Sequence, residues 1–127
     1  MDINTLCNTV REVSYAIHVY HGPGHVERIY ENALVHRLTK LGFRVEQQKP
    51  ISVLDEDGAP IGFYVADLVV DGRLLIELKA VRRIAPEHVA QVLGYLKSTR
   101  LEFALLLNFG DRVFGARRYA GSALWMR

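Results

Sequence analysis

The apolar positions in the first third of the chain repeat with helical spacing. Between residues 3 and 20 they lie three or four positions apart, and Asp2 or Asn4 is available as the N-terminal cap. The segment "HGPG" at 21–24 is expected to end this helix. A second helix is predicted from about His25 to Leu41, directly before a glycine of the kind that ends helices.

The remaining pattern is mostly extended. A turn at "DEDG" (55–58) and a "DG" at 71–72 mark two reversals of the chain. The predicted strands cover 43–54 (with a break at Pro50), 61–70, 73–79, 101–109 and 112–119, and a helix covers 87–99 with Pro86 in its first turn. This order, two helices, four strands, a helix and two strands, predicts an α/β sandwich around a mixed sheet.

Composition narrows the class of protein. A chain of 127 residues is long enough for one ordinary domain, so 1–127 is expected to be a single domain. Half of the residues are apolar and 24% are charged, which is typical of a globular protein, and no apolar run is long enough to span a membrane. The N-terminus does not resemble a signal peptide, and the one cysteine, Cys7, cannot form an internal disulfide. We therefore expect a cytoplasmic protein with Cys7 packed on a helix face.

Three charged residues interrupt two apolar strands. In "LLIELKA" (74–80), Glu77 and Lys79 share a strand face with Leu75, and Asp67 lies within the apolar segment "YVADLVV". Burying such a charge costs several kcal/mol unless it is compensated. Two carboxylates brought together repel each other unless a divalent cation lies between them, and Mg²⁺ prefers oxygen ligands of this kind. The pattern therefore indicates a site of chemistry rather than a plain core.

The hairpin between these strands provides a test of this interpretation. A two-residue turn at Asp71–Gly72 would pair Val70 with Arg73 and place Asp67 and Glu77 on opposite faces of the sheet. A shared metal site requires both on one face. We therefore predict an odd-length loop or a bulge, for which a glycine can supply the left-handed residue.

Three motifs carry a resemblance to a known family. Asp67 followed by "ELK" (77–79) resembles the D…(D/E)xK signature of the PD-(D/E)xK nuclease superfamily, although Ala66 stands where the superfamily often has proline. "GHVERIY" (24–30) is similar to the G-x-x-E-x-x-Y pattern of its GxxExxY branch. "QVLGY" (91–95) resembles the Q-x-x-x-Y motif of RecB-like nucleases. The resemblance covers nearly the whole chain.

The resemblance implies a restriction-endonuclease-like sandwich and a set of residue roles. Asp67, Glu77 and the backbone carbonyl of Leu78 would bind Mg²⁺ or Mn²⁺, Lys79 would be the catalytic lysine, and Glu27 would be an accessory acid that binds a second metal or a metal-bound water. Gln91 would position a water or a phosphate. Residues expected to contact nucleic acid are Arg82, Arg83, Lys97 and Tyr95.

The implied reaction is metal-dependent cleavage of DNA, with RNA a less favoured substrate. A water activated by Mg²⁺ would attack the scissile phosphate and leave a 5′-phosphate, while Lys79 stabilises the developing charge. A domain of this size has little surface to surround a duplex, so a homodimer is expected, as in small Holliday-junction resolvases of the superfamily. The alternative is a non-catalytic nucleic-acid-binding or assembly module that keeps the fold.

Simpler readings exist for several of these residues. Glu27 lies near a helix N-terminus, where the helix dipole favours any glutamate. Tyr30 and Tyr95 have core spacing, and Gln91 could be an ordinary surface residue. The histidines of "HVYHGPGH", which are His18, His21 and His25, allow a zinc site as a minor alternative.

Overall fold

Two helices form the N-terminal part of the chain, as predicted. In the computed structural model, which describes residues 1–122, α1 spans Ile3–His21 and α2 spans Glu27–Lys40. The side chain of Asp2 caps α1 by accepting a hydrogen bond of 3.0 Å from the backbone N–H of Thr5. Gly22 follows α1 with a φ of 69°, in the left-handed region that glycine adopts without strain.

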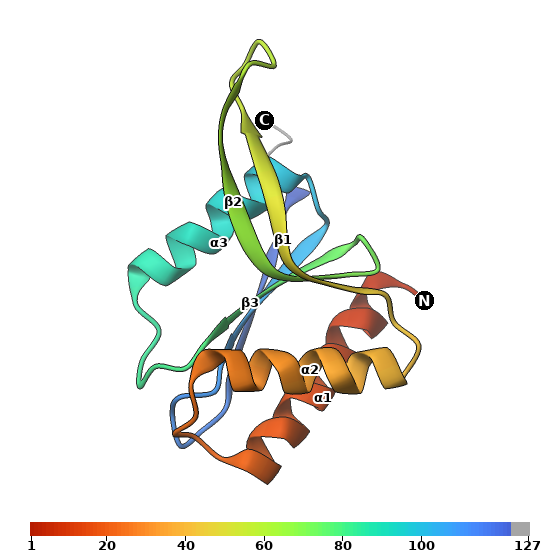
Figure 1. The fold of residues 1–127 in the computed structure, drawn as a ribbon, viewed down its shortest axis with the longest axis vertical. Coiled ribbons are helices and arrows are strands. Elements are labelled where there is room, and N and C mark those ends of the chain that lie inside the picture. Colours follow the sequence, from red (N-terminus) through yellow and green to blue (C-terminus); the bar gives the residue numbers. More distant parts are fainter. Residues whose placement is uncertain (123–127) are drawn as a thin grey trace.

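A five-stranded mixed sheet forms the centre of the molecule (Figure 1). The strands are β1 (Val45–Leu54), β2 (Pro60–Val70), β3 (Leu74–Lys79), β4 (Phe103–Asn108) and β5 (Gly115–Ala120), in the spatial order β1-β2-β3-β4-β5. Among the neighbouring strands that the structure describes, only β3 and β4 are parallel, because α3 (Pro86–Thr99) connects them as a crossover. The predicted mixed sheet flanked by helices is confirmed.

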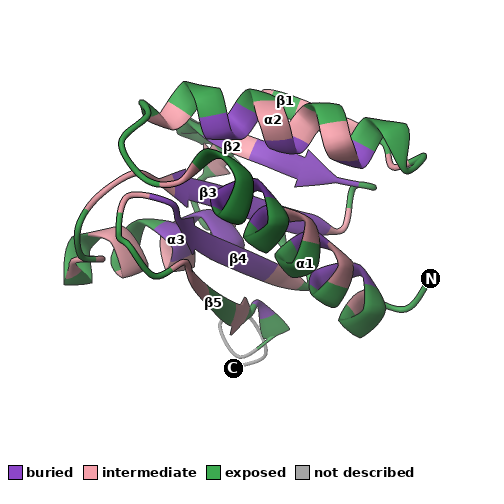
Figure 2. Cartoon of the chain, turned by 90° about the horizontal axis from the view of Figure 1, so that it is seen from below, coloured by how far each residue is buried: buried purple, intermediate pink, exposed green. Residues whose placement is uncertain are grey.

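Helices cover both faces of this sheet. Side chains from α1 and α2, such as Leu6 and Leu34, pack with Ile76 and Leu105 on one face. On the other face, Leu96 of α3 and its neighbours pack against the sheet. Figure 2 shows the buried residues concentrated in β3 and β4, between the helices. These two strands are buried on both faces, which explains their nearly continuous apolar sequence.

The predicted break at Pro50 is wrong. β1 is continuous, and Pro50 lies opposite Val65 of β2. β1 is the edge strand of the sheet, a position where a missing backbone N–H is tolerated. Within residues 1–122, five strands therefore form where the sequence pattern predicts six.

The hairpin of β1 and β2 projects beyond the rest of the sheet (Figure 1). β2 is paired with β3 only from Leu68 to Val70, whereas its pairing with β1 continues to Pro60. β2 and β3 therefore separate at Asp67, and the site described below lies where they separate. Among the described residues, no helix has the length and apolarity needed to cross a membrane.

Candidate active site

The loop between β2 and β3 decides the orientation of the two acidic residues. Val70 is paired with Leu74, so the loop contains three residues, Asp71 to Arg73, and not two. Asp71 and Gly72 both have positive φ values, 52° and 64°. The predicted odd-length loop is therefore confirmed, and the register places Asp67 opposite Glu77 on the same face.

Asp67 and Glu77 bridge the strands at the point where these separate. The backbone N–H of Asp67 donates to Oε1 of Glu77 at 3.2 Å, and the backbone N–H of Leu78 donates to Oδ2 of Asp67 at 2.9 Å. Each carboxylate thus accepts from the other strand, where the regular ladder has ended. This exchange holds both side chains in the gap between the strands, with Glu77 only 3% exposed.

The two carboxylates place more negative charge in the gap than the protein compensates. Burial, followed by the charge of Asp67, raises the pKa of Glu77 from 4.5 to about 9, and Lys79 offsets only part of this rise. Burial likewise raises the pKa of Glu27, and the charge of Asp67 adds to the effect. The facing carboxylates of Asp67 and Glu77 supply oxygen donors of the kind that a hard divalent cation prefers. The donor set therefore fits Mg²⁺ or Mn²⁺.

Glu27 is the first residue of α2, and Tyr30 fixes the turn that precedes it. The Tyr30 hydroxyl donates to the carbonyl of Gly22 at 2.6 Å and accepts from the backbone N–H of His25 at 3.1 Å. The ring is buried and stacks on Phe109, with 4.7 Å between the ring centroids. In the G-x-x-E-x-x-Y segment, the tyrosine therefore positions the turn from which the glutamate begins the helix.

Lys79 and Gln91 meet at the same face of the sheet. The Lys79 ammonium donates to Oε1 of Gln91, at the exposed side of α3, over 3.3 Å. One turn further along α3, the ring of Tyr95 packs on the ring of Tyr64 of β2, with 4.4 Å between the ring centroids. Tyr95 is only 6% exposed, and its pKa is raised by burial and by the charges of Glu77 and Asp67. The structure thus brings the lysine, the glutamine and the tyrosine to the acidic pair.

The remaining predicted residues lie further out. Arg82 and Arg83 are exposed in the loop after β3, and Lys97 is exposed near the end of α3. Among residues 1–122, no three Asp, Glu, His or Cys side chains are grouped closely enough to hold a metal ion, so Glu27 does not join the pair of acids in one such group. His18, part of the minor zinc alternative, is nearly buried, and its Nε2 is 2.8 Å from the carbonyl of Asp111.

The structure adds three residues that sequence reasoning missed. Glu31, buried one turn after Glu27, accepts hydrogen bonds from the amides of Gln47 at 2.6 Å and Gln48 at 2.9 Å. The Gln48 amide also lies 3.4 Å from Oδ1 of Asp67. A polar network therefore runs from α2 through β1 to the acidic pair. The available signal was the polar run "EQQK" (46–49) inside a predicted strand, which interrupts the expected alternation.

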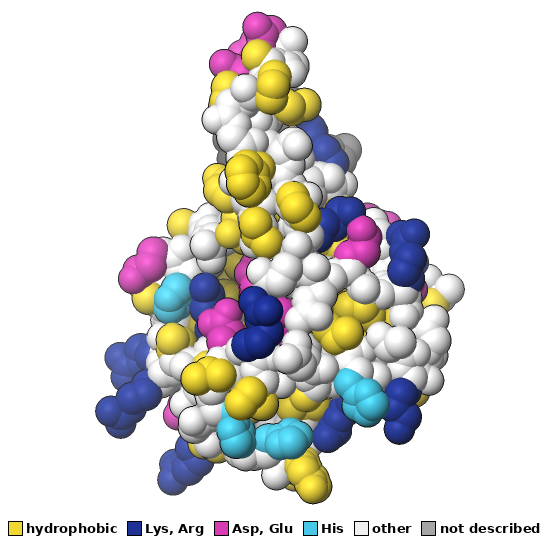
Figure 3. All heavy atoms as spheres, viewed as in Figure 1, with side chains coloured by type: hydrophobic (Ala, Val, Ile, Leu, Met, Phe, Trp, Pro, Cys, Tyr) yellow, Lys and Arg dark blue, Asp and Glu magenta, His cyan; other side chains and the backbone are white. Residues whose placement is uncertain are grey.

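Charged side chains gather near the middle of the face seen in Figure 3, below the projecting hairpin. Figure 3 shows acidic and basic side chains side by side near the middle of this face, with hydrophobic side chains along the hairpin above them. Exposed apolar residues of the hairpin include Ile61 (64% exposed) and Phe63 (69% exposed). An apolar surface on the hairpin therefore lies next to the charged side chains on this face.

Paired carboxylates next to a lysine on diverging strands form a compact group of charged side chains of the kind found at sites of chemistry. A family model described as the PD-(D/E)XK nuclease superfamily matches residues 4–119. The chain belongs to this superfamily, which supports a nuclease-type function and a restriction-endonuclease-like fold. No curated protein and no solved structure matched the chain. Assignment to the GxxExxY branch stays a prediction.

Proposed function

We propose that residues 1–127 form a nuclease domain that cleaves DNA with Mg²⁺ or Mn²⁺ and leaves a 5′-phosphate. The observation that carries this proposal is the pair of carboxylates of the half-buried Asp67 and the buried Glu77, which face each other across separating strands beside the ammonium group of Lys79. Superfamily membership supports the reaction class.

The carboxylates of Asp67 and Glu77 and the carbonyl of Leu78 would hold the metal, with Glu27 binding a second ion or an associated water. Bound there, Mg²⁺ would polarise the scissile phosphate and lower the pKa of an attacking water. The network of Glu31 and Gln48 orients Asp67 from the side of α2. The site therefore has both the ligands and a hydrogen-bonded support for them.

Lys79 has the position of a group that stabilises charge on the reacting phosphate. Its contact with Gln91 fixes the end of a long side chain, which would otherwise lose conformational freedom during the reaction. Because the negative charge on the phosphate oxygens is redistributed in the transition state, an ammonium placed here contributes to the rate more than to binding. Arg82 and Arg83 would instead bind the sugar–phosphate backbone.

A homodimer is part of the proposal. The projecting hairpin exposes Ile61, Phe63 and Val65 (40% exposed), which lie at alternate positions of β2 and so share a face. A two-stranded ribbon with an exposed apolar face is only marginally stable in water. A second copy that covers this face would both stabilise the hairpin and enlarge the surface available to DNA.

The decisive experiment is a cleavage assay on end-labelled single-stranded, duplex and branched DNA, with Mg²⁺, with Mn²⁺ and with chelator. Metal-dependent cleavage by the wild type, its loss in Lys79→Ala and its retention in Lys40→Ala would support the proposal. Lys40 is a matched control because it is exposed at the far end of α2. Binding of all substrates without cleavage of any would favour the non-catalytic module. Analysis of the 5′ end of any product tests whether cleavage leaves a 5′-phosphate.

A further inference from the structure

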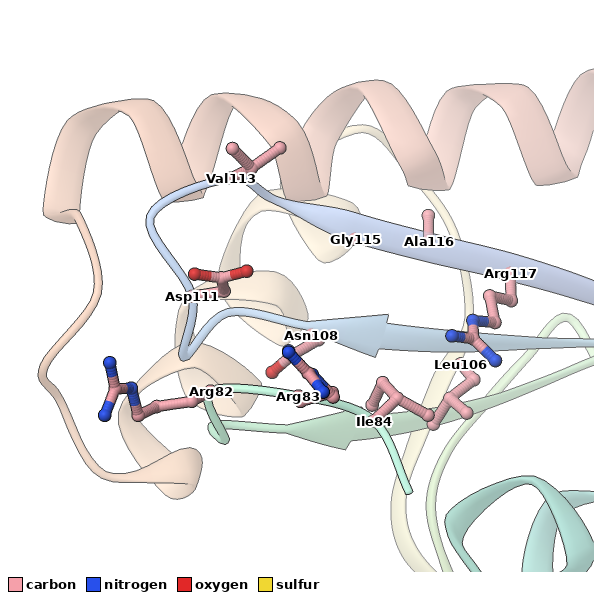
Figure 4. Close-up of a pocket in the computed structure, with 10 residues that line it drawn as sticks. All are labelled: Arg82, Arg83, Ile84, Leu106, Asn108, Asp111, Val113, Gly115, Ala116 and Arg117. Atoms are coloured by element: carbon pink, nitrogen blue, oxygen red, sulfur yellow. The ribbon is translucent and has the colours of Figure 1, made fainter. Parts of the chain in front are cut away.

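A cavity of about 760 Å³ lies next to β4 and β5, at the end of the sheet opposite β1. Figure 4 shows its lining, which comes from the loop after β3, from the end of β4, and from the loop and strand that follow. The acidic residues of the candidate active site, Asp67 and Glu77, do not line it. The cavity has the size of a ligand site that holds one nucleotide, and the proposed function assigns it no role beyond the two arginines of the loop.

The lining is strongly cationic. Arg82, Arg83 and Arg117 contribute three guanidinium groups, and Asp111 contributes the one carboxylate, so the lining carries a net charge of two positive units. In the described part of the chain, none of these arginines forms an ion pair. Figure 4 shows the side chains of Arg83 and Arg117 reaching toward the middle of the lining and Arg82 extending away from it. Arg83 and Arg117 are therefore available to an anion in the cavity.

Asn108 supplies an oriented hydrogen-bond donor at the same place. It is only 5% exposed, and its Oδ1 accepts from the backbone N–H groups of Val81 and Gly110, each at 3.1 Å. These two bonds fix which end of the amide is oxygen, so the Nδ2 group remains as a donor. Within residues 1–122 the side-chain hydrogen bonds of Asn108 both run to Oδ1, and no buried side-chain nitrogen or oxygen lacks a partner, so Nδ2 is an accessible donor of a residue that lines the cavity.

Two backbone segments approach each other closely beside Asn108. A Cβ atom at Gly110 would lie 2.1 Å from the backbone nitrogen of Val81, so only glycine allows these two loops to approach each other. The approach places the backbone N–H groups of both loops on Asn108. The donor is therefore held in a fixed direction before any ligand binds, which reduces the entropy cost of binding.

Apolar side chains complete the lining. The accessible apolar surface comes from Ile84, which is half-buried and follows Arg83 in the chain, and from Val113, which is 68% exposed, whereas Leu106 is only 1% exposed. A phosphate gains no favourable contact from apolar side chains, whereas a nucleobase or a sugar does. Cationic donors next to an apolar wall therefore match a nucleotide better than a free anion.

The cavity is next to the candidate active site. In the parallel pair of β3 and β4, Asn108 lies beside Lys79, and Leu106 lies beside Glu77. Neighbouring strands are about 4.8 Å apart. A nucleic acid strand bound at the acidic pair can therefore continue past the end of β3 and reach the cavity with a neighbouring nucleotide.

We propose that this cavity binds a nucleotide of the substrate strand that flanks the cleaved bond. Its phosphate contacts the guanidinium groups of Arg83 and Arg117 and the amide of Asn108, and its base or sugar lies against Ile84. The binding site follows from the cavity itself, whereas its assignment to the substrate strand rests on the proposed nuclease function. The site makes recognition depend on one well-placed nucleotide in addition to general attraction between charges.

The first experiment needs no cleavage. The side-chain amide signal of Asn108 is followed by NMR while deoxyadenosine monophosphate, deoxyadenosine or inorganic phosphate is added to the metal-free protein. We expect the monophosphate to shift this signal at lower concentration than either of its parts. Arg117→Ala should weaken monophosphate binding about tenfold or more, as does loss of one charge-assisted hydrogen bond.

Two further variants separate the site from general electrostatics and from misfolding. Arg112→Ala removes the same charge from an exposed residue that does not line the cavity, so it should change the affinity less than about twofold. Asn108→Asp keeps the oxygen that accepts from Val81 and Gly110 but replaces the donor by an anionic oxygen. It should lose monophosphate binding. Because a buried carboxylate also lowers stability, the NMR spectrum of the variant is first checked for the folded state.

The second experiment tests the link to the substrate strand. Short single-stranded oligonucleotides are titrated into wild type, Arg117→Ala and Arg112→Ala with chelator present, and cleavage is then assayed with Mg²⁺. We expect Arg117→Ala to bind the oligonucleotide about tenfold more weakly and to raise KM with little change in kcat. Binding that depends on Arg117 without any cleavage would support the cavity assignment and count against the nuclease function alone.

Three results would overturn the inference. The first is an equal loss of affinity in Arg112→Ala and Arg117→Ala. The second is an Asn108 amide signal that does not shift when the monophosphate is added. The third is monophosphate binding together with an oligonucleotide affinity and a KM that do not depend on Arg117. The last result would make the cavity a site for a free nucleotide rather than for the substrate strand.

Discussion

The buried carboxyl of Glu77 should destabilise the metal-free protein at neutral pH, and replacing it by glutamine should remove this penalty. Glu77→Gln keeps the size of the side chain and an oxygen that can accept from the backbone N–H of Asp67. It also replaces a carboxyl, whose ionised form is repelled by the Asp67 carboxylate, by an amide that stays neutral at every pH and can donate to it. We therefore expect the variant to be more stable than the wild type whenever no metal is present.

The magnitude follows from the raised pKa. The folded protein holds the Glu77 proton up to about pH 9, whereas the unfolded chain releases it near the ordinary value of 4.5. Between these values the unfolded state binds fewer protons, so the free energy of unfolding falls by about 1.4 kcal/mol for each unit that the pH rises. At pH 7 the accumulated loss is about 3 kcal/mol, or roughly 10 °C in Tm for a domain of this size.

The assay is thermal unfolding of both proteins with chelator at pH 5, 6, 7 and 8. The stability advantage of Glu77→Gln should be below about 1 kcal/mol at pH 5 and should grow steadily with pH. Glu12→Gln, an exposed position on α1, serves as the control and should show no such growth. Unfolding curves of wild type and Glu77→Gln that stay parallel from pH 5 to pH 8 would refute the reasoning.

Adding Mg²⁺ extends the same test to the proposed metal site. A cation bound between the two carboxylates stabilises their charged forms, so the wild type should gain stability that increases with the metal concentration. Glu77→Gln removes one anionic ligand, and its Tm should respond much less. An equal response in both proteins would place metal binding elsewhere.

Other predictions test individual contacts. Calorimetry with Mn²⁺ should show a binding site in the wild type that is lost in Asp67→Asn, and equal heats in both would contradict the ligand assignment. Lys79→Ala should abolish cleavage with nearly unchanged DNA affinity. Arg82→Ala should instead weaken DNA binding and give a shallower slope of affinity against salt concentration, with little effect on the chemical step. Identical profiles for the two variants would contradict this division of roles. Tyr30→Phe should lower the free energy of unfolding by about 1–2 kcal/mol, because the hydroxyl bonds to the turn before Glu27 are lost, and an unchanged Tm would show that the turn does not depend on them. Phe63→Asp should convert a dimer into a monomer in analytical ultracentrifugation, and a wild type that is monomeric at all concentrations would contradict the proposed homodimer.

The elements of the fold could be predicted from the sequence because each depends on neighbours a few positions away. Helical spacing of apolar residues placed α1 and α2 within a few residues of their observed ends, and the "DG" pair located the turn between β2 and β3. The odd loop length required one more step, namely that Asp67 and Glu77 could share a face only if the loop had an odd number of residues. Pro50 was misread because its effect depends on whether β1 lies at an edge, which no local pattern contains.

The sequence by itself determined which side chains face the same way, and the tertiary structure decided which of them meet. The same-face relation of Glu77 and Lys79 follows from the alternation of a strand, and the register extends it to Asp67. The contacts of Glu31 with Gln47 and Gln48 join α2 to β1 across the fold, and Asn108 joins the ends of β3 and β4. Such contacts depend on how helices pack on a twisted sheet and on where strands separate. Because many packings are compatible with one pattern of apolar residues, the polar network and the arginine-lined cavity became visible only in the folded chain.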